Sequence, residues 1–160
     1  MDPLIDLLDA EEFESLLARE ELRRSRTGET LAVAVLDVDG MRAVTTRHGA
    51  PARDEALRIC AAALSRSIRT VDEAAYTDHD EFCVLLHATD AEKVAVWVAR
   101  LEELLEGDSA AHPAGPLTCA VGLADTTEES SLMEVAARAR RRMEVIQTVR
   151  KLRRARESGG

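Results

Sequence analysis

The sequence predicts an α+β fold, an α/β sandwich in which helices surround a central sheet. Helical patterns with apolar residues every three or four positions alternate along the chain with short apolar runs. The run at 31–38 is almost continuously apolar, as expected of a central strand that is covered on both faces. A chain of 160 residues, 46% of them apolar, can fill one core. We therefore expect a single domain over residues 1–156, followed by a flexible tail at 157–160.

Periodicity and end residues define each element in chain order. A helix over 9–26 carries apolar residues on one side and ends near Gly28, a residue that suits a helix C-terminus. A second long helix covers 52–68, because Pro51 is tolerated in a first helical turn. The remaining predicted elements are a strand at 31–38, a helix at 40–48, strands at about 73–77 and 82–87, a helix at 90–106, a loop at 107–116, a strand at 117–123 and a final helix.

Membrane and disulfide classes are excluded by the apolar and cysteine patterns. No uninterrupted apolar stretch approaches the ~20 residues that span a bilayer, and the start Met1-Asp2-Pro3 lacks the regions of a signal peptide. We therefore expect a cytoplasmic protein. Cys60, Cys83 and Cys119 lie in apolar segments without metal-ligand spacing, which predicts reduced, buried thiols.

Charge is distributed unevenly between the body of the chain and its C-terminal end. Residues 1–137 hold 12 Lys and Arg against 28 Asp and Glu, a net −16, whereas residues 138–160 hold 9 against 2, a net +7. A basic amphipathic helix at this end could contact an anionic membrane or nucleic acid. We prefer the interpretation that this helix has a solvated face whose positive charges balance the net negative charge of the rest of the chain. Nucleic-acid binding is disfavoured because no aromatic residue lies among the basic ones. The apolar face of this helix consists of Leu132, Val135, Ala139, Met143, Ile146, Val149 and Leu152.

Acidic residues stand at the ends of two predicted strands. Asp37 and Asp39 close the first strand, and Asp80 and Glu81 open the third. Divalent cations take oxygen ligands and bridge phosphate oxygens, so converging carboxylates make a candidate metal and phosphate site. An alternative is that Asp37 and Asp39 cap the helix that follows, and we prefer this for Asp39. For Asp37 and Asp80 both interpretations stay open.

The acidic turn Tyr76-Thr77-Asp78-His79-Asp80-Glu81-Phe82 resembles the Gly-Gly-Asp/Glu-Glu-Phe signature of the GGDEF family of diguanylate cyclases. Only its second half is kept, but the resemblance covers nearly the whole chain. Further matching segments are Asp2 to Leu7, Leu31 to Gly40, Gly49 and Asp54 within a Gly-His-x-x-Gly-Asp segment, Arg69 to Asp72, and Leu117 to Ala124. The resemblance implies a nucleotidyl-cyclase-like fold with a mixed, mostly antiparallel sheet of about five strands surrounded by helices. It also implies a bacterial signalling domain that can form a homodimer.

A site for Mg²⁺ or Mn²⁺ is implied by the resemblance at Asp37, the backbone of Val38 and Asp80. Asp80 and Glu81 stand at the positions of the signature acids and are the vestige of the catalytic machinery. Carboxylates this close repel each other, so without metal the pKa of at least one of them should be raised.

The resemblance places a GTP-like substrate site at Arg42, Thr45, Asp54, Asp78 and His79. The signature glycines, which let backbone approach the phosphates, are replaced by Asp78 and His79. The family's guanine-binding Asn is Thr45, which lacks an amide. The late Lys-x-x-Gly-Arg motif that clamps phosphates aligns with residues 144–148, where Glu144 replaces a cation. We therefore predict that catalysis is lost; an active or weakly active cyclase that uses GTP and Mg²⁺ is the less favoured alternative.

The resemblance also implies a binding site for the reaction product, and the motif of that site is complete in this chain. Arg69-Thr70-Val71-Asp72 matches the Arg-x-x-Asp motif where relatives bind cyclic di-GMP, and Arg100 stands where relatives place another contacting arginine. Arginine and carboxylate groups suit guanine edges, so we predict a cyclic di-GMP receptor. Two alternatives stay open. Arg69 and Asp72 could form a surface ion pair of little energetic worth, or the domain could be a structural dimerisation or docking module whose partner the sequence does not identify.

Overall fold

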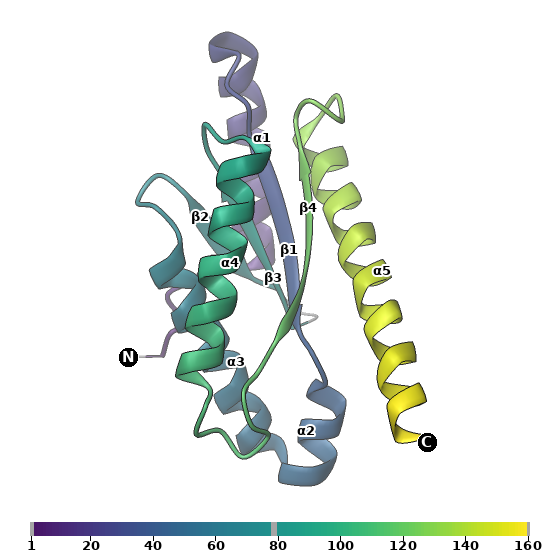
Figure 1. The fold of residues 1–160 in the computed structure, drawn as a ribbon. Coiled ribbons are helices and arrows are strands. Elements are labelled where there is room, and N and C mark those ends of the chain that lie inside the picture. Colours follow the sequence, from purple (N-terminus) through teal and green to yellow (C-terminus); the bar gives the residue numbers. More distant parts are fainter. Residues whose placement is uncertain (1, 78–79, 160) are drawn as a thin grey trace.

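The computed structural model describes residues 2–77 and 80–159, which form a four-stranded antiparallel sheet and five helices (Figure 1). The strands are β1 (Ala32–Val38), β2 (Glu73–Tyr76), β3 (Glu81–Leu86) and β4 (Cys119–Asp125), in the order β2-β3-β1-β4. The helices are α1 (Ala10–Thr27), α2 (Met41–His48), α3 (Ala50–Ser67), α4 (Ala91–Asp108) and α5 (Leu132–Ser158). The predicted α+β fold is confirmed.

Strand β1 lies in the middle of the molecule and is covered on both faces. Ala34 and Leu36 belong to a buried cluster with α3 and α4, whereas Val33 and Val35 belong to a second cluster with α1 and α5. Successive side chains of a strand point to opposite faces, so the continuous apolar run serves two cores at once. Figure 1 shows α3 and α4 in front of the sheet and α1 behind it.

The number of strands differs from the expected five. Among the described residues the sheet has four strands, and its only parallel pairing is an isolated bridge between Leu8 and Ala75. Leu8 donates to the carbonyl of Ala74 and accepts from the amide of Tyr76. The extension stops there because Asp9 caps α1 through a capping box with Glu12.

The C-terminal helix continues beyond its predicted end. The sequence predicts a flexible tail at 157–160; Glu157 and Ser158 are the last residues of α5, and the flexibility of this end stays a prediction. No helix-breaking residue interrupts the segment between Ser131, the N-cap, and Gly159, the C-cap. Although α5 has 27 residues, no helix in the described ranges is long and apolar enough to cross a membrane.

Helix α5 is seated on the sheet by its first half. Leu132, Val135, Ala139 and Met143 are buried, but the apolar face that the sequence predicts does not stay covered, because Val149 and Leu152 are exposed. The preferred interpretation of the basic face is confirmed in part. Its arginines reach acidic partners of the body through the ion pairs Arg138–Glu129, Arg140–Glu81, Arg142–Glu128 and Arg150–Asp39.

All three cysteines are buried and unpaired, as the sequence predicts. Burial in apolar surroundings disfavours the thiolate and raises the pKa of Cys83 to about 11 and that of Cys119 to about 12. These thiols therefore act as small apolar side chains of the core.

A glycine allows α5 to approach the sheet closely. A Cβ atom at Gly122 of β4 would overlap the carbonyl oxygen of Ala139 and lie 2.9 Å from the Cα atom of Met143. Both contacts are with helix backbone, which cannot move aside as a flexible side chain can. The position of α5 on the sheet therefore depends on the missing side chain at residue 122.

Replacing Gly122 with Ala should displace α5 and lower the free energy of unfolding by roughly 1–3 kcal/mol or more, the usual cost of overpacking. Urea denaturation followed by circular dichroism measures this. The matched control is Gly107→Ala in α4, where nothing lies within 4 Å of the added Cβ, and there a helical alanine should stabilise by roughly 0.5–1 kcal/mol. Equal midpoints for the two variants would contradict this account of α5 packing.

Candidate functional site

The ends of β1 and β3 bring the predicted acidic residues together. Asp37 and Glu81 are cross-strand partners in the antiparallel pair, Asp39 follows β1 and Asp80 precedes β3. Directly opposed residues on one face of a sheet lie close to each other. The convergence of carboxylates that the sequence predicts is therefore present.

Helix α5 supplies a polar partner to three of these carboxylates. The side-chain amide of Gln147 donates to Asp37 at 2.9 Å, and Nε of Arg140 donates to Glu81 at 3.0 Å. The guanidinium of Arg150 donates to Oδ2 of Asp39 at 2.6 Å. Each acid on this side of the sheet is thus bound by a side chain of the same helix.

Asp80 is bound from the other direction, by α3. Its backbone has a φ of 59°, a left-handed conformation that aspartate tolerates better than most residues. One carboxylate oxygen forms an ion pair with Arg53, and the other accepts from the hydroxyl of Tyr76 at 2.5 Å. Asp80 and Asp37 therefore engage different elements and different partners.

Burial and neighbouring charge act on Asp37. Desolvation raises the pKa of the Asp37 carboxyl, the nearby Glu81 and Asp39 carboxylates raise it further, and the hydrogen bond from Gln147 opposes part of that shift. A raised pKa at this cluster is what the sequence predicts for a crowded acidic site. Ionised Asp37 therefore lowers the stability of the folded protein relative to protonated Asp37.

The two carboxylates of the predicted metal set already have partners inside the fold. Within residues 2–77 and 80–159, no group of three or more His, Cys, Asp or Glu side chains is placed to hold a metal ion. Asp37 is bound by Gln147 and Asp80 by Arg53. A cation that used both carboxylates would have to displace these internal partners, so the present arrangement does not fit a divalent metal.

The capping role expected of Asp39 is wrong. The N-cap of α2 is Gly40, which makes no side-chain capping bond. Asp39 instead accepts from the hydroxyl of Thr118 at 2.7 Å as well as from Arg150. Its Oδ1 atom is buried without a hydrogen bond among the described residues, and Arg154 lies 3.8 Å away.

The predicted substrate residues that the structure describes lie on α2 and α3. Arg42 and Thr45 are exposed on α2, and the Thr45 hydroxyl donates to the carbonyl of Met41 at 2.9 Å. Asp54 is exposed on α3, 3.7 Å from a nitrogen of Arg53. Asp78 and His79, which replace the signature glycines, lie outside the described residues.

Arg53 and Gln147 are the site residues that the sequence prediction missed. Arg53 occupies the second glycine of the Gly-His-x-x-Gly-Asp segment, so a position-by-position comparison could have found it. The sequence aligns the late Lys-x-x-Gly-Arg motif with residues 144–148, where Glu144 stands at the position of the lysine. The side chain that reaches Asp37 is Gln147, whereas Glu144 lines another pocket together with Arg140. Only the seating of α5 reveals which turn of the helix faces the acids.

The Arg69–Asp72 motif forms a well-defined turn rather than a loose surface pair. Asp72 is buried, with a side chain 2% exposed, and accepts four hydrogen bonds from Arg69 and His87. The donors are the Arg69 amide, Nε and Nη2 and the His87 amide. Because the carboxylate is saturated, the interpretation as a surface pair of little worth does not describe it.

Arg69 and Arg100 gather near the C-terminal end of α3. The Arg69 side chain is 52% exposed, its Nη2 also donates to the carbonyl of His87, and its Nη1 has no hydrogen-bond partner among the described residues. Arg100 of α4 donates to the carbonyl of Arg66 at 3.2 Å. Arg69, in the turn after α3, and Arg100 of α4 thus both lie near the C-terminal end of α3.

Comparison with known proteins assigns this architecture. A family model described as "Diguanylate cyclase, GGDEF domain" matches residues 1–152. Diguanylate cyclase DgcP of Pseudomonas aeruginosa is 33% identical over 124 residues, which are 76% of this chain and 18% of DgcP. The chain therefore spans less than a fifth of that relative.

Solved structures share the fold at low sequence identity. Diguanylate cyclase SiaD of Pseudomonas aeruginosa, in complex with its activator SiaC, has a TM-score of 0.83 and 22% identity, over 92% of this chain and 58% of that chain. The coiled coil and GGDEF domain of DgcB from Caulobacter crescentus, in complex with c-di-GMP, has a TM-score of 0.79 and 23% identity, over 90% and 78%.

The sheet order, the helices on both faces and the acidic strand ends define a cyclase-type α+β domain. The chain belongs to the GGDEF domain family of diguanylate cyclases. The family that the sequence predicts is confirmed.

Asp37→Asn tests the cost of the buried carboxylate. Because the folded-state pKa of Asp37 is raised, the native protein binds a proton that the unfolded chain has released, and stability falls as pH rises through this window. The Asn variant keeps an acceptor for Gln147 without the charge. It should be the more stable protein at neutral pH, and its advantage should disappear as pH falls toward the ordinary aspartate value of about 4.

Urea denaturation at the two pH values measures this difference. The exposed Asp6, replaced by Asn, is the matched control and should show a smaller and flatter effect. An Asp37→Asn variant that is less stable than wild type at neutral pH would contradict the assignment.

Proposed function

We propose that this chain is a catalytically inactive GGDEF domain that binds cyclic di-GMP. The observation that carries the first half is the ion pair between Arg53 and Asp80. Phosphoryl transfer depends on metal ions and cations that neutralise developing charge. Here the Arg53 guanidinium forms an ion pair with Asp80, a carboxylate that a metal would need. The Gln147 amide donates to the other such carboxylate, Asp37.

Binding of cyclic di-GMP is supported by the geometry of Arg69. Asp72 holds Nε and Nη2 in place, so Nη1 can meet an anionic or guanine ligand without first ordering a flexible side chain. Preorganisation of this kind reduces the entropic cost of binding. Arg100 adds a second cation on the neighbouring helix. The complex of DgcB with c-di-GMP is consistent with a ligand of this class.

Asp72 acts in this proposal by positioning Arg69. Its oxygens are saturated by the Arg69 and His87 donors, and the residue is buried. The ligand would therefore be contacted by the guanidinium groups, and Asp72 would orient the first of them.

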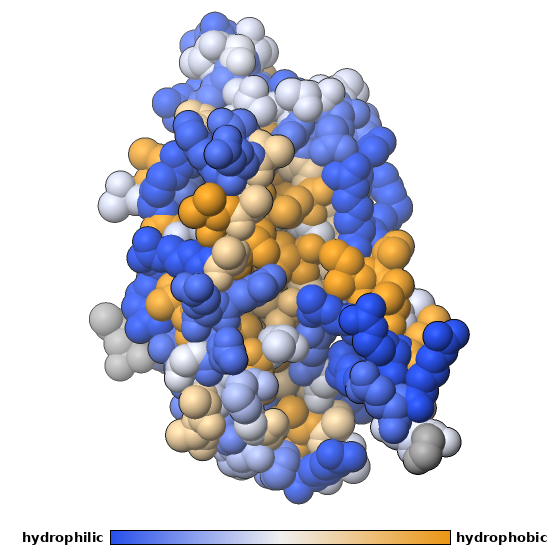
Figure 2. All heavy atoms as spheres, in the orientation of Figure 1, coloured by the Kyte–Doolittle hydropathy of each residue, from blue (hydrophilic) through white to orange (hydrophobic). Residues whose placement is uncertain are grey.

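A docking module is the second candidate, supported by a specific surface. Val145, Val149 and Leu152 are exposed on α5, and Figure 2 shows apolar atoms gathered over the middle of this helix between hydrophilic stretches. Residues spaced by three or four along a helix share one face. Such a stripe suits a helix of a second copy in a homodimer or of a protein partner.

The chain should form no detectable cyclic di-GMP from GTP with Mg²⁺ or Mn²⁺. Product is measured by chromatography after prolonged incubation, with DgcP as the positive control and Asp80→Ala as the background. Product well above the Asp80→Ala background would contradict the inactive assignment. Product equal to that background supports it.

Arg69→Ala should weaken cyclic di-GMP binding by about one to two decades in isothermal titration, since a charge-assisted hydrogen bond contributes roughly 1.5–3 kcal/mol. Arg100→Ala should weaken it less. The control Arg58→Ala removes an equal charge from α3, where the ion pairs of Arg58 among the described residues are contacts of 3.6 Å and 4.0 Å with acids.

Arg69→Ala leaves Asp72 with fewer donors, so a thermal melt must accompany the titration. Arg100→Ala keeps the test valid if the first variant unfolds, because the one hydrogen bond of Arg100 among the described residues is to a backbone carbonyl. The receptor proposal fails if wild type shows no binding at high micromolar ligand, or if neither arginine variant changes the titration. The docking module then takes its place.

A further inference from the structure

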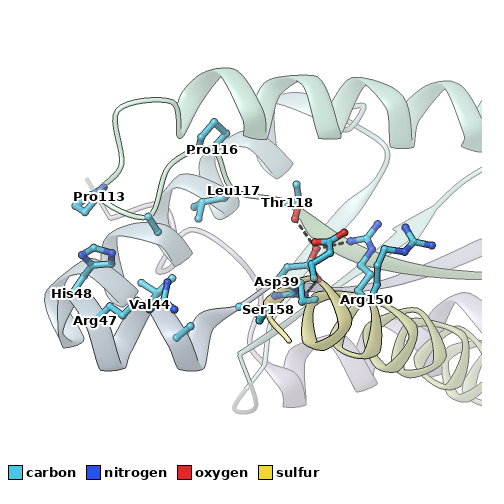
Figure 3. Close-up of a pocket in the computed structure, with 16 residues that line it drawn as sticks. Asp39, Val44, Arg47, His48, Pro113, Pro116, Leu117, Thr118, Arg150 and Ser158 are labelled. Carbon is cyan, nitrogen blue, oxygen red and sulfur yellow. Dashed lines mark hydrogen bonds and ion pairs between the residues drawn. The ribbon is translucent and has the colours of Figure 1, made fainter. Parts of the chain in front are cut away.

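An open pocket of about 800 Å³ lies between α2, the loop before β4 and the last turns of α5 (Figure 3). It shares only Asp39 with the strand-end carboxylates and contains neither Arg69 nor Arg100. This volume is in the range of pockets that hold small molecules. The pocket is therefore separate from the proposed cyclic di-GMP site.

Positive charge predominates around this pocket. Arg47 of α2 and Arg150, Arg153 and Arg154 of α5 line it, against the carboxylates of Asp39 and Glu157. Asp39 is already bound by Arg150 and by the Thr118 hydroxyl. Arg47 and Arg153 have neither an ion pair nor a hydrogen bond from their guanidinium groups among the described residues. These two cations are uncompensated in a protein whose net charge is −9.

The floor of the pocket is apolar. Val44 and Leu117 are buried, and Pro113 and Pro116 continue the lining along the loop. Figure 3 shows His48 and Arg47 at one end of this floor and Arg150 at the other. A ligand with an anionic group and a flat apolar part would match both features, because guanidinium groups bind phosphate strongly and apolar surface favours a ring.

The walls of the pocket are held in place before any ligand binds. The loop is anchored by Ser109, whose hydroxyl accepts from the Leu117 amide at 2.7 Å, and by His112, whose Nε2 lies 2.8 Å from the carbonyl oxygen of Ala52 in α3. On the opposite side Arg150 donates to the carbonyl of Cys119 at 2.7 Å. A preformed wall lowers the entropic cost of binding.

We infer that this pocket binds a phosphate ester that carries an apolar ring, with Arg47 of α2 and Arg153 of α5 supplying the positive charge that attracts the phosphate and Val44 and Leu117 contacting the ring. Arg150 is held by Asp39 and Cys119 and shapes the wall. The site is a second ligand site of the domain, and its occupancy does not require the proposed cyclic di-GMP site.

The test uses isothermal titration with 1-naphthyl phosphate, inorganic phosphate and 1-naphthol. Naphthyl phosphate should bind more tightly than either of its parts. Replacing Arg47 and Arg153 together with Ala should weaken it about tenfold or more, the loss expected for a charge-assisted contact. Both residues are exposed and unpaired, so the double variant should fold, as a thermal melt verifies.

Two controls separate this site from general electrostatics and from the other site. Lys151→Ala removes a charge from α5 outside the pocket, and Arg69→Ala alters the proposed cyclic di-GMP site; neither should change naphthyl phosphate binding. The inference fails if the double variant binds like wild type, if Lys151→Ala loses as much affinity, if inorganic phosphate binds as tightly as the ester, or if no binding occurs at millimolar concentration.

Discussion

The seating of α5 on β4 is the contact on which the acidic strand ends depend. Gly122 lets the helix backbone lie against the strand, and that position brings Arg140, Gln147 and Arg150 over Glu81, Asp37 and Asp39. These three helical residues are separated by seven and then three positions, a spacing that keeps them on one face of a helix. A helix displaced by one turn would present other side chains to the acids.

Side chains of α5 and α3 neutralise the strand-end carboxylates, as bound cations do in a metal site. Neighbouring carboxylates in a partly buried place repel each other unless other groups compensate their charge. Here guanidinium and amide groups of α5 and α3 donate to them. A tethered cation stabilises the fold without any dependence on metal concentration. The same tether engages an Asp80 oxygen, and this is the observation on which the proposal of an inactive domain rests.

Local signals in the sequence predicted the fold well, and long-range partners were the part that they could not supply. Helix α1 ends at Gly28 as expected and begins within one residue of its predicted start, because the caps Asp9 and Gly28 act within a few residues. The expected cap at Asp39 was wrong because a partner 111 residues away, Arg150, competes for the same oxygen. Helix α5 extends past residue 156 because no local breaker precedes Gly159, and Arg53 was overlooked although it replaces a motif glycine.

The arginines of this protein fall into two groups, those that form an ion pair inside the fold and those that are left to bind a ligand. Where a guanidinium has an acidic partner inside the fold, as Arg140 has in Glu81, its charge is already used and its contribution is to structure. Where a guanidinium has no partner among the described residues, as for Arg47 and Arg153, the charge stays available to a ligand. Arg69 is intermediate, because Asp72 takes its Nε and Nη2 donors and leaves Nη1. In a chain with 30 acidic residues against 21 basic ones, the cations that the fold leaves uncompensated are therefore the most informative about function, because acidic partners for them are abundant.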